Sequence, residues 1–319
     1  MPRNLGEPIL LLGAGYMATE YAKVLSALEI PFICVGRSRE GTFAFQEKTG
    51  HEAIPDGLEK YMDKNAMPSY AIVTVNAIDS SEAVVRLLEG GVKHILAEKP
   101  CGLNIEEVRR VAKTTEKYGA ETLVAYNRRF YASVLAAEEI IREQGGVDSM
   151  MFEFTEWLHV IKGATNATQE KNALLQCNSA HVIDLAFHLC GRPKELTCFT
   201  KGPADWYGEA RAFSGAGETE KGALFSYSAN WTGPGRWGLE IVAGSRRLIF
   251  RPLEQLHIQE MKSVNIKRID IDDELDIDFK PGLYKQTQAF LNGNDRDRML
   301  NIAEQLENSR IYARIAGLV

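Results

Sequence analysis

Residues 9–18 read Ile-Leu-Leu-Leu-Gly-Ala-Gly-Tyr-Met-Ala, an apolar run that leads directly into the pattern G-x-G-x-x-A. In such a pattern Gly13 allows a tight turn, Gly15 lets backbone approach a pyrophosphate, and Ala18 lets the next helix pack closely. The N-terminus of that helix offers N–H groups to the phosphates. The alternative is an ordinary strand–turn–helix without a ligand. We predict a dinucleotide site that includes Gly13, Ala14, Gly15, Tyr16 and Met17.

The arrangement of strands and helices in residues 1–126 predicts the fold around this turn. Strand-like and helix-like stretches alternate, which is typical of a doubly wound parallel sheet of the α/β class. The expected strands are Ile9–Leu12, Pro31–Val35, Ala71–Val75, Ile95–Ala97 and Thr122–Tyr126. The expected helices are Tyr16–Leu28, Phe43–Lys48, Ser81–Leu88 and a segment that Asn104 caps and Gly119 ends.

The pattern changes from about Phe130, and a chain of 319 residues is long for a single core. A long helix is expected over Ser133–Gln144, and helices at Lys285–Leu291 and Ile302–Ile315 close the chain. Strands with apolar alternation are expected at Met150–Glu156, Ala223–Trp231, Gly238–Ala243 and Arg247–Arg251. We therefore expect a Rossmann domain at residues 1–126 and an α+β domain at residues 127–319, whose C-terminal helices pack back on the first domain.

Charge and cysteine content exclude several classes of protein. The net charge is −6 and no basic stripe is present, so nucleic acid is not the expected partner. No apolar run has the length of a signal peptide or of a membrane span, so no membrane partner is expected. The five cysteines form no CxxC pair, and we expect free thiols in a reducing cytoplasm.

Ligands of a doubly wound sheet bind at the carboxyl ends of the strands, near the point where the strand order reverses. Glycine or polar residues follow every predicted strand of the first domain: Gly13–Gly15, Gly36–Ser38, Asn76, Glu98–Lys99 and Asn127–Arg129. Loops are commonly polar, but this does not explain Lys99, which leaves a strand directly before a proline. We expect Asn76, Glu98 and Lys99 to lie at the cofactor.

The end of the second strand indicates which cofactor binds. An NAD site usually has an acidic residue there for the ribose hydroxyls, but this chain has Gly36, Arg37 and Ser38. A glycine makes room for a 2′-phosphate, a guanidinium pairs with it, and a hydroxyl donates to it. We therefore predict NADP, with NAD possible if Arg37 is a solvated loop cation and Glu40 takes the ribose.

With these motifs, the chain resembles the Gfo/Idh/MocA oxidoreductase family. The resemblance rests on Gly13–Gly15, on Ala97-Glu98-Lys99-Pro100, on residues 126–130 and on His181-Val182-Ile183-Asp184. It implies a Rossmann domain plus a domain with an open-faced mixed sheet, and a tightly held nicotinamide cofactor. It also implies hydride transfer at a carbinol carbon of a sugar, cyclitol or sugar-derived acid or nucleotide sugar. Family members usually form oligomers through the open sheet face, so a homodimer or homotetramer is expected.

The resemblance implies that Lys99 and His181 are catalytic, and that the Lys99–Pro100 bond is cis. His181 is the better base because the pKa of an imidazole lies near neutrality, whereas Lys99 would stabilise a developing alkoxide. A lysine beside a cationic nicotinamide could also exchange roles with the histidine.

The substrate pocket is expected to use the segments Trp157–Thr168 and Asn230–Trp237. Within and near them, aromatic, amide and guanidinium groups suit a sugar ring that carries an acid or phosphate. The predicted substrate-binding residues are Tyr126, Asn127, Arg128, Asn178, Trp231 and Arg236. The alternative for each tryptophan is packing in the core.

The chain departs from the family pattern at Cys177, where the family often has an aspartate four residues before the histidine. On an α-helix this residue would share a face with His181 and raise the pKa of the imidazole. With a thiol instead, His181 is expected to titrate near or below an ordinary histidine. His181, Asp184 and His188 resemble a metal site, but suitably spaced further ligands are missing, so no metal is expected and Asp184 is assigned to a ring N–H or a backbone group.

Two other functions stay open at this point. Because Cys177 replaces the family's aspartate and fold does not determine function, a non-catalytic NADP-binding sensor or scaffold on the same fold is an alternative hypothesis. Reduction of an imine or enone is a third hypothesis, and this function requires a pocket suited to a large planar ligand.

Overall fold

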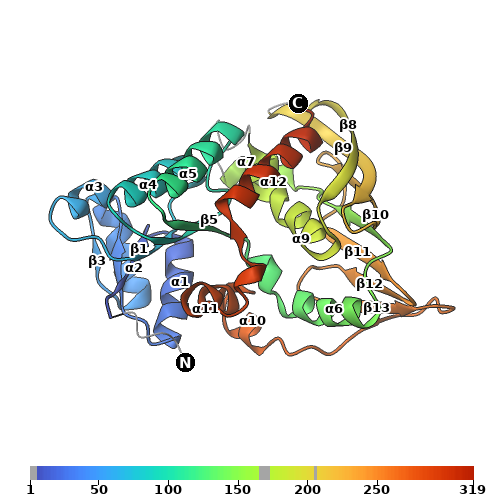
Figure 1. The fold of residues 1–319 in the computed structure, drawn as a ribbon, viewed down its shortest axis with the longest axis horizontal. Helices are drawn as coiled ribbons and strands as arrows, with labels where there is room; N and C mark the ends of the chain where they lie inside the picture. The colour runs from blue at the N-terminus through green and yellow to red at the C-terminus, as the bar shows by residue number, and fades with distance from the viewer. Residues whose placement is uncertain (1–5, 165–172, 205–206) are drawn as a thin grey trace. The chain divides into compact units, whose positions relative to one another are not determined.

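The computed structural model describes residues 6–164, 173–204 and 207–319 (Figure 1). The chain forms two compact units, and each unit combines segments that are distant in sequence. The first unit comprises Met1–Asn127 and Leu275–Glu307, and the second comprises Arg128–Glu274 and Asn308–Val319. The predicted domain limits, 1–126 and 127–319, stay a prediction.

The sheet of the first unit has seven strands. They are β1 (Ile9–Leu12), β2 (Phe32–Val35), β3 (Ala53–Ile54), β4 (Tyr70–Val73), β5 (His94–Glu98), β6 (Glu121–Ala125) and β15 (Leu300–Asn301). Their order is β15-β6-β5-β4-β1-β2-β3, and all neighbours are parallel except β15, which is antiparallel to β6. The strand order reverses between β1 and β4, as in a Rossmann fold. The predicted doubly wound sheet is confirmed.

Helices account for the burial of this sheet. They are α1 (Tyr16–Ala27), α2 (Arg39–Thr49), α3 (Gly57–Met62), α4 (Ala77–Glu89), α5 (Ile105–Lys117), α10 (Glu274–Asp278), α11 (Leu283–Asn292) and the 3-10 turn η3 (Arg296–Arg298). Every residue of β1 is buried, as expected for a parallel strand with helices on both faces. Asn104 caps α5 as predicted, because its Oδ1 accepts from the backbone N–H of Glu107 at 3.0 Å.

The second unit has a mixed sheet of eight strands. They are β7 (Ser149–Glu153), β8 (Pro193–Ala204), β9 (Tyr207–Thr219), β10 (Leu224–Asn230), β11 (Gly238–Ala243), β12 (Arg246–Phe250), β13 (His257–Glu260) and β14 (Ile266–Arg268). Their order is β14-β13-β12-β11-β7-β10-β9-β8, and only β7 and β10 pair in parallel. The predicted α+β arrangement is confirmed.

One face of this sheet is covered and the other is open. The remaining helices are η1 (Asn127–Phe130), α6 (Ala132–Glu143), α7 (Leu158–Ala164), the π-helix η2 (Leu175–Ser179), α9 (Ala180–Cys190) and α12 (Ile302–Ala316). Helix α9 packs against β7 and β11, and all its residues except His188 are buried. Along β10, buried residues such as Phe225 and Tyr227 alternate with exposed residues such as Leu224 and Ser226. The sheet is therefore open-faced, as the resemblance implies.

Several strands escaped the sequence analysis for identifiable reasons. Strand β9 contains glycines, which are unfavourable in isolated strands. A Cβ on Gly217 would overlap the carbonyl oxygen of Glu195 on the neighbouring strand, so the glycine permits the close approach of β8 and β9. The expected strand Met150–Glu156 ends earlier, at Glu153, which frees its last residues for the site described below.

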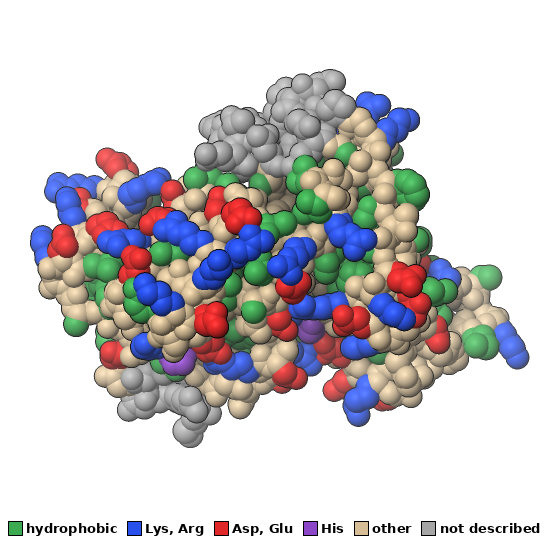
Figure 2. Space-filling model, turned by 45° about the horizontal axis from the view of Figure 1, so that its top comes forward, with side chains coloured by type: hydrophobic (Ala, Val, Ile, Leu, Met, Phe, Trp, Pro, Cys, Tyr) green, Lys and Arg blue, Asp and Glu red, His purple; other side chains and the backbone are tan. Residues whose placement is uncertain are grey.

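The surface carries both signs of charge. Figure 2 shows acidic and basic side chains interspersed over the visible face of the molecule. In the first unit, Arg86 pairs with Glu59 and Glu89, and Arg110 pairs with Glu82. Among the described residues, no helix has the length and apolar character that crossing a bilayer requires.

Candidate active site

A pocket of about 450 Å³ lies at the carboxyl ends of β1, β2 and β4 in the first unit. The residues predicted to bind the cofactor that line it are Gly13, Ala14, Gly15, Arg37, Ser38 and Asn76. Five other described residues were also predicted to bind the cofactor but do not line this pocket: Tyr16, Met17, Gly36, Glu98 and Lys99. Residues predicted from the ends of three different strands therefore line one and the same pocket.

At the glycine turn the backbone packs closely against Thr74 at Gly13 and adjoins open space at Gly15. Gly13 has φ +115°, and a Cβ there would lie 2.5 Å from Thr74 Oγ1 and 3.0 Å from the backbone of the same residue. A Cβ on Gly15 would meet nothing within 4 Å, so open space adjoins the backbone at this position. Helix α1 follows directly, and no side chain caps its N-terminus. Its first N–H groups can therefore serve an anion.

The end of β2 differs from the expectation in one respect. A Cβ on Gly36 would lie 2.6 Å from Thr42 Cγ2 and 2.8 Å from Ala14 Cβ. Protein atoms thus occupy the space beside Gly36, which corrects the prediction that this glycine makes room for a phosphate. The glycine instead allows the turns after β1 and β2 to pack together.

Arg37 and Ser38 both line the pocket. The Arg37 guanidinium contacts Asp79 at 3.0 Å, and its side chain is 79% exposed. The Ser38 hydroxyl accepts from the backbone N–H of Gly41 at 3.1 Å and caps α2. An anion in the pocket can recruit Arg37 only in competition with the Asp79 carboxylate.

Glu98 is the last residue of β5 and Lys99 follows it, at the same edge of the sheet. The Tyr21 hydroxyl donates to Glu98 Oε1 at 3.0 Å and so ties β5 to α1. Burial raises the pKa of Glu98, while the charge of Lys99 opposes that shift. The Lys99–Pro100 peptide bond is cis.

Two residues predicted to bind substrate have structural roles in the first unit. Tyr126 is 1% exposed and belongs to the core. Asn127 is buried, and its Nδ2 donates to the carbonyl of Pro281 at 2.9 Å. The amide thereby holds the segment before α11. Both side chains are buried, and their assignment to the substrate stays a prediction.

In the second unit, α9 carries His181, which is 6% exposed. Its ring centroid lies 5.9 Å from that of Trp237. The segment before it, Leu175–Ser179, is π-helical, so Cys177 does not precede His181 by one regular α-helical turn. The expected sharing of one helical face by these two residues therefore does not apply.

Asp184 pairs with a guanidinium, not with a ring N–H or backbone group as expected. Arg129 Nε and Nη2 donate to its two carboxylate oxygens at 2.8 and 2.6 Å. Asn308 Nδ2 donates to Asp184 Oδ1 at 3.1 Å. On the same helix, His188 Nε2 contacts Glu138 at 3.1 Å, and burial lowers the pKa of His188. Within the described ranges, no group of three or more His, Cys, Asp or Glu is placed to hold a metal.

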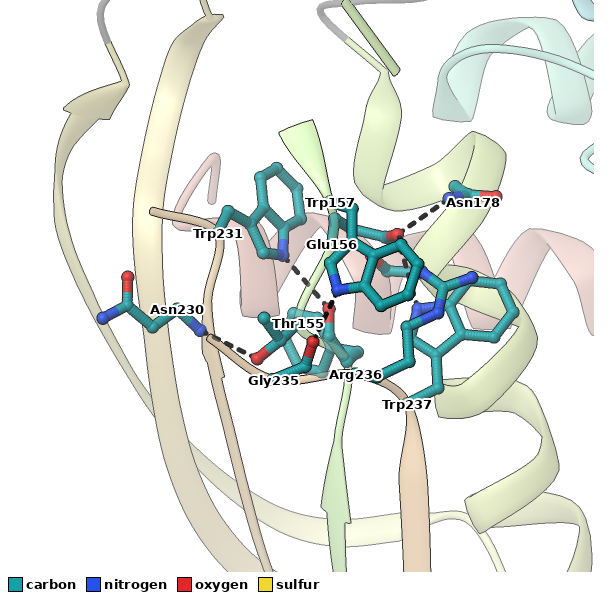
Figure 3. A network of polar contacts seen from close by, with 11 residues as sticks. Thr155, Glu156, Trp157, Asn178, Asn230, Trp231, Gly235, Arg236 and Trp237 are labelled. Atoms are coloured by element: carbon teal, nitrogen blue, oxygen red, sulfur yellow. Dashed lines mark hydrogen bonds and ion pairs between the residues drawn. The ribbon is translucent and has the colours of Figure 1, made fainter. Parts of the chain in front are cut away.

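A buried carboxylate that the sequence analysis missed lies at the centre of this unit's polar network (Figure 3). The Glu156 side chain has no exposed area. Its Oε1 accepts from Ser179 Oγ at 2.6 Å and from Trp237 Nε1 at 3.2 Å. Its Oε2 accepts from Asn178 Nδ2 at 2.8 Å and from Arg236 Nη1 at 3.4 Å.

Burial raises the pKa of Glu156 to about 7, against the hydrogen bonds and the Arg236 charge, which favour the carboxylate. The strand pattern contained a signal for this residue. Met150, Phe152 and Phe154 point inward, and Glu156 continues the same series. A buried acidic side chain needs hydrogen-bond donors or a positive charge beside it, but the sequence does not show which residues supply them.

Two of the remaining predicted substrate residues, Arg236 and Arg128, lie on Trp237. The guanidinium carbon of Arg236 is 4.5 Å from the Trp237 ring centroid and 4.9 Å from that of Trp157, and Figure 3 shows it beside both rings. The guanidinium carbon of Arg128 is 4.8 Å from the Trp237 ring. Asn178 joins the same network through Glu156. The structure thus brings Arg128, Asn178 and Arg236 together.

Trp231 has the packing role that was considered as its alternative. It is 2% exposed, its Nε1 donates to the carbonyl of Phe154 at 3.1 Å, and its ring packs on Phe213. These contacts favour packing in the core for Trp231, and its assignment to the substrate stays a prediction. Within the expected substrate segment Trp157–Thr168, residues 165–168 lie outside the described part of the chain.

These features define a protein with a Rossmann-type unit, which has a pocket at its glycine turn, and a second unit built on an open-faced mixed sheet. Residues 8–126 match the sequence model of the Gfo/Idh/MocA family, described as "Oxidoreductase family, NAD-binding Rossmann fold". The resemblance to this family is thereby confirmed. Comparison with curated proteins gave no sequence match.

Solved structures of oxidoreductases share the fold over nearly the whole chain. An oxidoreductase from Agrobacterium radiobacter, in complex with NAD+, L-tartaric acid and magnesium, aligns with a TM-score of 0.79 at 12% identity, covering 98% of this chain and 95% of that one. Levoglucosan dehydrogenase in complex with NADH aligns with 0.79 at 15% identity, covering 98% and 96%. UDP-N-acetylglucosamine 3-dehydrogenase from Acidithiobacillus ferrooxidans aligns with 0.75 at 13% identity, covering 98% and 97%. At these identities the likeness establishes the fold.

Proposed function

We propose that the protein is an NAD(P)-dependent dehydrogenase that transfers a hydride to or from the carbinol carbon of a sugar, a cyclitol, a sugar-derived acid or a nucleotide sugar. One observation carries the proposal: the glycine turn, Asn76 and Lys99 follow β1, β4 and β5, which are adjacent and parallel. The carboxyl ends of parallel strands share one edge of a sheet, which is where such folds bind ligands. The names of two structural neighbours, both sugar dehydrogenases, support the substrate class.

The proposed chemistry assigns one role to each of two residues. A bound nicotinamide would accept or supply the hydride. During oxidation of an alcohol, an imidazole nitrogen of His181 would take the hydroxyl proton. The Lys99 ammonium would stabilise the negative charge that develops on the oxygen in either direction, and during reduction the His181 imidazolium would return the proton. Lys99 directly follows β5, and His181 lies on α9.

The proposal is tested by incubating the purified protein with NADP or NAD and a panel of polyols, sugars, sugar acids and nucleotide sugars. Formation of reduced nicotinamide with at least one member supports the dehydrogenase. Tight cofactor binding without turnover of any member would favour the non-catalytic sensor instead.

We also propose that the cofactor is NADP and that Arg37 holds its 2′-phosphate. Replacing Arg37 by alanine is expected to lower the ratio of NADP to NAD affinity by about tenfold or more, because charge-assisted contacts to a phosphate are strong. Cofactor titrations of Arg37→Ala and of the neighbouring control Arg39→Ala measure the ratio. An unchanged ratio in Arg37→Ala would show that the Asp79 pair keeps this guanidinium from the phosphate.

We further propose that the protein forms a homodimer or homotetramer through the open sheet face. Met151 and Phe199 are 50% and 67% exposed there, and small side chains such as Ser214 and Ser226 surround them. Phe199→Asp is expected to reduce the mass in sedimentation to that of the monomer, because a charge on a buried apolar interface is unfavourable. Ile277→Asp, at an exposed position of α10, serves as the control. An oligomer that survives Phe199→Asp would contradict this choice of interface.

A further inference from the structure

Arg236 has an unusually rigid setting for a partly exposed arginine. Its guanidinium stacks on the rings of Trp157 and Trp237, at 4.9 and 4.5 Å from the centroids. Both rings are fixed, because Trp157 Nε1 donates to the carbonyl of Gly235 at 2.8 Å and Trp237 Nε1 donates to Glu156. A stacked guanidinium is already ordered, so it loses little freedom when it binds a planar anion.

The donors of Arg236 are only partly used within the protein. In the described part of the chain, its one ion pair is with Glu156, through a single nitrogen at 3.4 Å. By contrast, Arg129 and Arg251 each engage a carboxylate through two nitrogens. The Arg236 side chain is 45% exposed, so further N–H groups can reach a ligand. The Arg128 guanidinium, 4.8 Å from the Trp237 ring, adds a second positive charge near that ring.

We propose that Arg236, seated on Trp157 and Trp237, binds the carboxylate group of the substrate, which is therefore a polyhydroxy acid. This inference rests on the proposed function and narrows its substrate class. A planar carboxylate matches the fork of a guanidinium and carries one negative charge. A dianionic phosphate fits less well, because the Glu156 carboxylate lies beside the same guanidinium and would repel it.

Glu156 adds a dependence on pH to this site. Its pKa is raised to about 7 by burial, so the group changes charge near neutrality. The ionised form competes with the ligand for Arg236, whereas the protonated form does not. Acid binding should therefore weaken as pH rises through about 7. Among the described residues, the other charged or titratable groups near this site are Arg128 and His181 around Trp237, His159 beside Trp157, and Glu153, which Arg251 neutralises.

The test is an equilibrium titration of the full-length protein with cofactor, followed by tryptophan fluorescence, with matched pairs of probes. D-gluconate is compared with D-glucitol, and D-glucuronate with D-glucose, because each pair differs in the charged group. The wild type is expected to bind each acid at least about tenfold more tightly than its neutral partner. Arg236→Gln should abolish this preference, whereas Arg268→Gln, an equal charge change on exposed β14, should preserve it.

Glu156→Gln supplies the second readout. It is expected to remove the fall in acid affinity between pH 6 and pH 8, about one unit on either side of the Glu156 pKa, and to bind acids more tightly than the wild type at the upper end. A pH dependence that persists in Glu156→Gln would contradict the role of this carboxyl.

Three results would overturn the carboxylate site. They are equal binding of acids and neutral partners by the wild type, equal behaviour of Arg236→Gln and Arg268→Gln, and tighter binding of D-glucose 6-phosphate than of both acids. Failure to bind any acid at millimolar concentration would also count against it. These titrations do not depend on turnover, so a failure here is distinct from the absence of dehydrogenase activity, which would contradict the proposed function.

Discussion

Lys99→Met and His181→Ala are each expected to lower kcat by about 10²–10⁴ while the affinity for NADP stays close to that of the wild type. The histidine variant lacks the proposed acceptor of the hydroxyl proton. The methionine variant keeps the length and apolar stem of the lysine but removes the charge that would stabilise the alkoxide. Neither Lys99 nor His181 is one of the described residues that line the pocket at the glycine turn, so we expect both variants to bind the cofactor.

Turnover and cofactor binding need to be measured separately to test this expectation. Steady-state kinetics with the best substrate of the panel give kcat, and titration of NADP gives the affinity. Lys93→Met is a matched control, because Lys93 precedes the other end of β5 and donates to the carbonyl of Tyr118 at 2.7 Å. Near-normal turnover in both Lys99→Met and His181→Ala would rule out the scheme, whereas a loss in only one would leave that residue as the acid–base group.

Asp184→Ala is expected to destabilise the second unit by about 3–5 kcal/mol, because it leaves a buried guanidinium without its counter-charge. The Arg129 and Asp184 side chains are only 9% and 1% exposed, and they share two hydrogen bonds. The loss also frees the amide of Asn308, which donates to the same carboxylate. Arg129→Leu combined with Asp184→Leu is expected to recover much of the stability, since neither charge then remains buried.

Urea unfolding followed by tryptophan fluorescence measures this effect in the relevant unit. The four tryptophans lie between residues 157 and 237, within the sequence range of the second unit. Glu260→Ala is the control, because it breaks the exposed pair with Arg246 and is expected to cost at most about 1 kcal/mol. If Asp184→Ala and Glu260→Ala shift the unfolding midpoint equally, the buried pair does not stabilise this unit.

Short-range patterns were sufficient for much of the first unit. Ile9–Leu12 forms β1 as predicted, and Asn104 caps α5, because apolar runs, glycine turns and helix caps act between residues that are near in sequence. The same patterns did not reveal β15, whose two residues form a strand only by pairing with β6, far away in the chain. They also did not reveal β8 and β9, where glycines meet the neighbouring strand.

In the candidate site, too, some features could be predicted from the sequence and others could not. The pocket at the glycine turn followed from the sequence, because the ends of parallel strands must share an edge. The partners of buried polar groups could not be predicted from the sequence. Asp184 accepts hydrogen bonds from Arg129, and Glu156 accepts them from Ser179, Asn178, Trp237 and Arg236.

The sequence by itself thus determined the Rossmann architecture, the position of the pocket at the glycine turn and the placement of Lys99 at the carboxyl edge of its sheet. Only the tertiary structure decided that Trp231 and Tyr126 belong to cores, that Gly36 serves packing, and that Glu156 and Arg236 form one site. The physical reason is that backbone conformation follows from local composition and periodicity. The partner of a buried polar side chain is instead chosen by segments that folding brings together from distant parts of the chain.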